Sequence, residues 1–98
     1  MKNSETKRLE LDFTCSLPEV RLRPGLRTSV WAEDAPEYCT PCEFQQVAGS
    51  SAPVRVKVVV LDPDDRITER YVHATFYFGH PGRIVGYGQL VALVGEED

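Results

Sequence analysis

The sequence has no run of about 20 consecutive apolar residues, which is the length that a membrane-spanning helix requires. Its opening stretch, MKNSETKRLELD, has no apolar centre of the kind found in signal peptides. We therefore expect no membrane segment and a cytoplasmic protein. A length of 98 residues suits one hydrophobic core. We expect a disordered tail over residues 1–7, a single domain over 8–95 and an acidic tail over 96–98.

Positive charge is scarce: 11 Lys and Arg stand against 15 Asp and Glu, a formal net charge of −4. Binding to a phosphate backbone is dominated by Lys and Arg, so an acidic chain is a poor non-specific binder of nucleic acid. The one local basic candidate is RLRPGLR, which contains Arg21, Arg23 and Arg27. Nucleic acid is therefore not the expected partner, and RNA contact through this segment is kept as an alternative.

Cysteine is also scarce, and the three present, Cys15, Cys39 and Cys42, fit a reducing compartment better than a disulfide framework. The CTPC spacing of Cys39 and Cys42 resembles redox and zinc motifs. A redox pair, however, opens a helix, and no helical pattern follows here. A zinc site needs two further ligands, for which only Cys15, His73 and His80 remain. We expect structural cysteines and no cofactor or metal, with a zinc- or thiol-dependent function centred on Cys39 and Cys42 as an alternative.

No complete catalytic constellation is visible. His73 and His80 have no serine or cysteine near them in a nucleophile context. The acidic segment from Asp62 to Glu69 lacks the glycine and the spacing of a calcium loop, so a solvated turn is expected there. The chain is not expected to be an enzyme.

What the sequence does contain is two-residue alternation. In LELDFTCSL, residues 9–17, apolar and polar side chains alternate, and VRVKVVVL, residues 54–61, repeats this with valine. Further extended segments are expected at residues 26–32, 38–44, 71–78 and 84–93. Pro41 cannot donate to a strand ladder, so it predicts an edge or a bulge. Five to seven short strands with turns between them predict an all-β fold, and a small closed barrel hides the strand edges most completely.

The glycine-rich stretch GHPGRIVGYGQLVAL, residues 79–93, could be taken for a phosphate-binding loop. Such a loop lies between a strand and a helix, or ends in Lys followed by Ser or Thr. Here no Lys follows, and the next residues form an apolar run without helix caps. A strand with a shift in alternation at Gly86–Gly88 is expected instead, because a glycine bulge bends barrel strands.

This stretch also resembles a known family. GRIVGYGQLVAL is similar to the last strand of the third domain of elongation factor Tu, whose pattern is Gly-Arg-x-Val-Gly-x-Gly followed by apolar residues. The pattern falls here on Gly82, Arg83, Val85, Gly86 and Gly88. The family's Arg-Pro before its second strand is matched by Arg23 and Pro24, and the order of strands is similar over residues 8 to 94.

The resemblance implies a closed six-stranded antiparallel barrel. In the family this domain packs against a GTPase domain and touches aminoacyl-tRNA, and the turn at Pro81, Gly82 and Arg83 corresponds to part of that contact surface. These 98 residues contain no counterpart of the GTPase domain, and the loop PEVRL between the first two strands is shorter than in the family.

From these observations we expect a non-enzymatic protein-binding module that acts as an adaptor or regulator. The sequence does not identify its protein partner, and the resemblance suggests a translation component. A tRNA- or RNA-contacting translation accessory domain is a further alternative. Trp31, Tyr71 and Tyr77 are predicted on outward faces, where they form either a recognition patch or the scatter of aromatic residues that the solvent side of a small barrel tolerates. The predicted binding residues are Arg23, Pro24, Pro81, Gly82 and Arg83.

Overall fold

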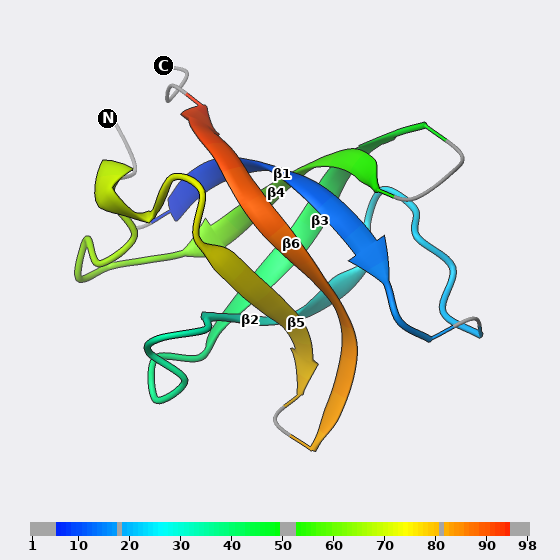
Figure 1. Ribbon diagram of the computed structural model, residues 1–98, viewed down its shortest axis with the longest axis horizontal. Coiled ribbons are helices and arrows are strands. Elements are labelled where there is room, and N and C mark those ends of the chain that lie inside the picture. Colours follow the sequence, from blue (N-terminus) through cyan, green and yellow to red (C-terminus); the bar gives the residue numbers. More distant parts are fainter. Residues whose placement is uncertain (1–5, 18, 50–52, 81, 95–98) are drawn as a thin grey trace.

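The structure is a computed structural model that describes residues 6–17, 19–49, 53–80 and 82–94 (Figure 1). The alternating segments form strands because β-branched and aromatic side chains pack well on a pleated surface. The strands are β1 (Thr6–Cys15), β2 (Arg27–Ala32), β3 (Thr40–Ala48), β4 (Val54–Leu61), β5 (Thr75–His80) and β6 (Arg83–Val94). A short 3-10 turn, η1 (Glu69–Tyr71), precedes β5.

The six strands form one antiparallel sheet in the order β1-β4-β3-β2-β5-β6, and β6 pairs with β1, so the sheet closes in a ring. Figure 1 shows β6 and β1 crossing over the front of this ring, with the β5–β6 hairpin at the bottom of the view. The all-β class and the closed, six-stranded antiparallel arrangement are confirmed. Among the described residues no helix has the length and hydropathy needed to span a membrane.

The interior of the ring is filled by the predicted inward faces of the strands. Three phenylalanine rings meet at its centre: the centroid of Phe13 lies 5.4 Å from that of Phe44 and 5.1 Å from that of Phe78, both edge to face. Edge-to-face packing is a favoured arrangement of aromatic rings. The remaining fully buried side chains on the strands include Leu9, Leu11, Val30, Val56, Val58, Val60, Phe76 and Leu90.

Gly86 and Gly88 allow β6 to approach β1 closely. A Cβ atom on Gly86 would lie 2.5 Å from the Phe13 ring and 2.5 Å from the Thr14 carbonyl oxygen. A Cβ on Gly88 would lie 3.1 Å from the Asp12 carbonyl oxygen. The glycines therefore serve the shape of the closed sheet, as the sequence predicts.

The position of the shift in alternation differs from the expectation. Gly86, Gly88 and Leu90 all face inward in one regular run. The register instead shifts on either side of this run, where Val85 is left unpaired with β5 and Val91 is left unpaired with β1. The bulges therefore flank the Gly-Tyr-Gly sequence rather than lying within it.

Three other boundaries also differ. Strand β1 begins at Thr6, so Lys7 belongs to the sheet and not to a disordered tail, while residues 1–5 and 95–98 lie outside the described part of the chain. The predicted strand over 71–78 begins only at Thr75, because His73 has a positive φ of 79° that ends the preceding turn. The predicted segment at 38–44 is β3, which begins at Thr40 and continues to Ala48. Within it, Pro41 lies opposite Ser29 and one residue before β3 first pairs with β4, which fits the edge position expected for a proline.

The first prediction concerns the closure of the sheet. Gly86→Ala should destabilise the protein by roughly 2–3 kcal/mol, because Phe13 and the β1 backbone would have to move. Thermal and denaturant unfolding would measure this loss. Gly82→Ala is the matched control, since a Cβ there meets nothing within 4 Å. Equal unfolding midpoints for the two variants would contradict this prediction, because they would show that a Cβ atom at residue 86 fits beside Phe13 without loss of stability.

Candidate functional site

Three aromatic side chains form a row across the outer face of the sheet. Trp31 on β2 pairs with Tyr77 on β5, which pairs with Tyr87 on β6. We call these three residues the aromatic row. They point outward because their neighbours Val30 and Phe76 point inward, and side chains alternate along a strand. The Trp31 and Tyr77 rings stack with centroids 6.2 Å apart, so this end of the row is held in one arrangement.

The row has one buried and one exposed end. Trp31 is only 9% exposed although it lies outside the core cluster, whereas Tyr87 is 43% exposed. The Tyr77 hydroxyl donates a hydrogen bond to Glu33 at 3.1 Å, which raises the pKa of Tyr77. Glu33 is itself held by its backbone N–H, which donates to the Thr75 carbonyl at 2.9 Å. The row therefore presents a fixed aromatic surface whose free end is Tyr87.

Tyr87 shares its strand with the predicted binding residue Arg83, and Gly82 immediately precedes that strand. Gly82 and Arg83 lie at the turn between β5 and β6, and both are exposed. Ile84 follows them and is 41% exposed. We call Gly82, Arg83, Ile84 and Tyr87 the β6 surface. Pro81, the third predicted residue of this turn, lies outside the described residues.

Arg83 connects the β6 surface to the loop between β1 and β2. Its guanidinium forms an ion pair with Glu19. Both side chains are more than half exposed, so the pair is screened by water and adds little to stability. Its effect is to hold Arg83 beside an acidic group, which lowers the net positive charge of this turn.

Arg23 and Pro24 lie on the same loop but in a different place. Both are exposed, and the adjacent Gly25 donates its backbone N–H to the Phe44 carbonyl on β3 at 2.8 Å. Strand β3 is three strands away from β6 in either direction around the ring. No hydrogen bond or ion pair in the described parts of the chain joins Arg23 to the β6 surface, so the five predicted residues do not form one described cluster.

Of the three aromatic residues expected on outward faces of strands, Trp31 and Tyr77 lie there, whereas Tyr71 does not lie on a strand. Tyr71 is part of the 3-10 turn and packs against the core residue Phe76, with ring centroids 5.8 Å apart. Tyr87 takes the third place in the row. The signal that could have found it is the inward run of Gly86, Gly88 and Leu90, which places Tyr87 outward.

Cys39 and Cys42 have different environments. Cys42 is buried in the core, and burial raises the pKa of its thiol to about 12. Cys39 is exposed immediately before β3. Within the described ranges no three His, Cys, Asp or Glu side chains are grouped as a metal site would require. Their geometry therefore gives no support to the zinc or thiol alternative.

Asp62, expected from the sequence to lie in a solvated turn, is buried instead. Its side chain is fully buried and accepts four hydrogen bonds: from the Tyr38 hydroxyl at 2.7 Å, from the backbone N–H groups of Arg66 and Ile67 at 2.9 Å each, and from the Lys7 ammonium at 2.9 Å. Burial by itself would raise the pKa of Asp62, but these donors outweigh it and lower the pKa. The carboxylate holds the loop after β4 in place.

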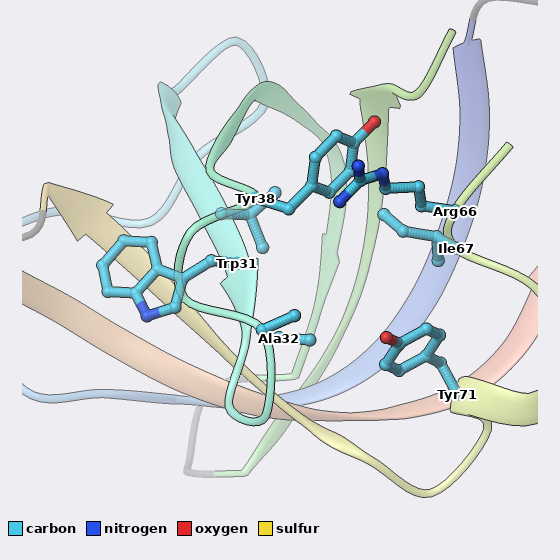
Figure 2. Close-up of a pocket in the computed structure, with 8 residues that line it drawn as sticks. Trp31, Ala32, Tyr38, Arg66, Ile67 and Tyr71 are labelled. Carbon is cyan, nitrogen blue, oxygen red and sulfur yellow. The ribbon is translucent and has the colours of Figure 1, made fainter. Parts of the chain in front are cut away.

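A cavity of about 330 Å³, including its opening to solvent, lies next to this loop (Figure 2). The end of β2 and the loops after β2 and β4 form its walls. Figure 2 shows Tyr38 and Tyr71 on two sides of the cavity and the indole of Trp31 pointing away from both. The lining residues are Val30, Trp31, Ala32, Ala35, Tyr38, Arg66, Ile67 and Tyr71.

No protein-family model, curated protein or solved structure matches the chain. The likeness to the third domain of elongation factor Tu therefore depends on the sequence motifs given above.

The second prediction concerns Asp62. Asp62→Asn should lower the free energy of unfolding by about 3 kcal/mol near neutral pH, because it places an amide against four donors and leaves Lys7 without its buried partner. A group with a lowered folded-state pKa stabilises the protein above its unfolded pKa and loses that effect as pH falls. The difference from the wild type should therefore shrink below the ordinary Asp value of 3.8.

Denaturant unfolding at a series of pH values would measure this difference. Asp64→Asn is the control, since Asp64 is exposed in the same turn. A loss that is the same for both variants, or that does not vary with pH, would contradict the role given to Asp62.

The third prediction concerns the thiols. Cys39 should react readily with iodoacetamide at about pH 8, whereas Cys42 should react only after unfolding, since a pKa of about 12 leaves roughly one thiolate in ten thousand at that pH. Mass spectrometry of labelled peptides would distinguish the two. Equal labelling rates in the folded protein, or a stoichiometric amount of bound zinc, would contradict the structural role of Cys42.

Proposed function

We propose that the chain is a non-enzymatic protein-binding module, a single barrel similar to the third domain of elongation factor Tu, which docks a protein partner through the β6 surface. The observation that carries this proposal is the exposure of Ile84 and Tyr87 on the same strand as the Gly82–Arg83 turn. Aromatic residues and arginine are enriched where proteins bind one another, and they supply most of the energetically important contacts.

The supporting feature beside the β6 surface is the aromatic row. Tyr77 is held by Trp31 on one side and by Glu33 through its hydroxyl, so the surface next to Tyr87 loses little freedom when a partner binds. Binding costs are lower when contacting side chains are already ordered. This favours a docking surface over a scatter of unrelated apolar residues.

Binding is proposed rather than catalysis because the side chains with catalytic chemistry lie apart. His73 is on the loop after β4, His80 is at the end of β5, and Cys42 is in the core. In the family, the third domain of elongation factor Tu is a docking domain, and a translation component is the class of partner that the resemblance suggests. The role of adaptor or regulator is part of this proposal.

Protein is favoured over RNA as the partner because two arginines of the turn and loop region face carboxylates. Arg83 pairs with Glu19, and Arg27 pairs with Glu43 at 3.2 Å between Nε and Oε1. Phosphate binding depends on uncompensated positive charge. The net charge of −4 also disfavours RNA as the partner, because it repels phosphate groups.

The fourth prediction tests this surface. The tagged protein should recover a protein partner from its own cell lysate, and Ile84→Ser together with Tyr87→Ser should reduce that recovery at least about tenfold, since each removes an apolar anchor. Arg83→Ala should weaken recovery as well, and more than Arg23→Ala, which lies near β3. Quantitative mass spectrometry of the captured proteins, with sequencing of captured RNA, would measure these effects.

Leu61→Ser is the matched control, because Leu61 is an exposed apolar residue, 38% exposed, on β4 rather than β6. It should leave recovery unchanged. A partner that is retained by the Ile84 and Tyr87 variant, or RNA recovered in place of protein, would contradict the proposal. Circular dichroism would establish that all variants remain folded.

A further inference from the structure

The cavity beside Tyr38 is separate from the β6 surface and has its own chemistry. Its apolar wall is formed by Val30 and Ala32 at the end of β2 and by Ile67 after β4. These side chains belong to the core cluster, so the wall is rigid. Such a wall favours a compact aliphatic group, because burying apolar surface is favourable by about 25 cal/mol per Å². Without its opening to solvent the cavity has a volume of only about 40 Å³, so it suits a compact group and not a large ligand.

Arg66 lies at the mouth of this cavity. Its guanidinium carbon sits 4.5 Å from the centroid of the Tyr38 ring, and Figure 2 shows the side chain lying over that ring. Stacking of this kind orients the planar group and leaves its N–H edges free to bind. Among the described residues, no carboxylate or carbonyl accepts a hydrogen bond from the Arg66 side chain.

The nearest buried carboxylate is already occupied. Asp62 accepts from Lys7, from Tyr38 and from two backbone N–H groups, so its charge is matched by Lys7 and not by Arg66. The Tyr38 hydroxyl is also occupied, and burial followed by the Asp62 contact raises the pKa of Tyr38 to about 12. Tyr38 is therefore neutral at physiological pH. Arg66 remains as an oriented positive charge beside an apolar cavity.

We propose that this cavity binds a carboxylate on a short, branched aliphatic stem. The carboxylate accepts hydrogen bonds from Arg66, and the branched stem packs against Val30, Ala32 and Ile67. Arginine suits this role because its planar fork matches both oxygens of a carboxylate. The same chemistry occurs in free branched-chain acids and at the C-terminus of a peptide that ends in an aliphatic residue. This site goes beyond the proposed function and does not depend on it.

The test uses the full chain labelled with nitrogen-15 and followed by two-dimensional amide NMR. The probes are 3-methylbutanoate and N-acetyl-L-leucine, with the amides 3-methylbutanamide and N-acetyl-L-leucinamide as uncharged matches of the same shape. We expect saturable shifts at the amides of Ala35, Ile67 and Tyr71 for at least one acid below about 20 mM, the range expected for ligands of this size. The matching amide should bind at least about tenfold more weakly.

The two acids distinguish the two sources of the carboxylate, a free branched-chain acid and the C-terminus of a peptide. Saturation with N-acetyl-L-leucine alone indicates a peptide C-terminus, saturation with 3-methylbutanoate alone indicates a free acid, and saturation with both indicates that the cavity recognises the shared chemistry. No saturable shift with either acid would overturn the proposal. Equal binding of an acid and its amide would overturn it as well, since the carboxylate would then contribute nothing.

Two variants assign the roles within the site. Arg66→Gln should weaken acid binding at least about tenfold, while Arg70→Gln should change it less than about twofold. Arg70 is the matched control because it also lies over a tyrosine, 5.4 Å from the Tyr71 ring, but does not line the cavity. Ala35→Leu should abolish binding by filling the space. Equal effects of the Arg66 and Arg70 substitutions would overturn the assignment of Arg66.

Discussion

The closed sheet depends on the close approach of its last strand to its first. Strand β6 completes the ring by pairing with β1, and this pairing places Gly86 against the ring of Phe13. Phe13 in turn contacts Phe44 and Phe78, which come from β3 and β5. A side chain at residue 86 would compete with Phe13 for the same space. The absence of one Cβ therefore links the closure of the sheet to the packing of its centre.

A second constraint organises the end of the ring where the cavity lies. The buried Asp62 carboxylate binds Lys7 from β1, Tyr38 from the loop after β2, and the backbone of residues 66 and 67. These segments are distant in sequence, and Asp62 joins all of them; Lys7 also donates to the Ile67 carbonyl, and Arg66 stacks on Tyr38. A buried carboxylate is tolerated when its charge is paired and its oxygens accept hydrogen bonds. The same contacts position Tyr38 and Arg66 at the mouth of the cavity.

The two candidate surfaces differ in their physical basis. On the β6 surface, Ile84 and Tyr87 are exposed beside a fixed aromatic row, and this is the surface that we propose for protein docking. In the cavity, an oriented guanidinium stands beside a rigid apolar wall, which suits a small charged ligand. One fold can carry both because β5 and β6 form the first surface and the loops after β2 and β4 form the second.

The inward and outward faces of β1 and β4 were predictable from sequence, since alternation of Leu9, Leu11 and Phe13, or of the valines after residue 53, follows from strand geometry alone. The role of the glycines in shape was also predictable, because the residues around them fit no phosphate loop. The bulges at Val85 and Val91 were not, because a register shift depends on the partner strand as much as on the strand itself.

By itself, the sequence determined the strands and their buried faces, because those depend on the local period of apolar residues. Only the tertiary structure decided the environment of Asp62, the place of Tyr87 in the aromatic row and the separation of Arg23 from Arg83. Each of these depends on contacts between segments far apart in the chain. The local composition of a turn or strand does not determine which distant segment packs against it.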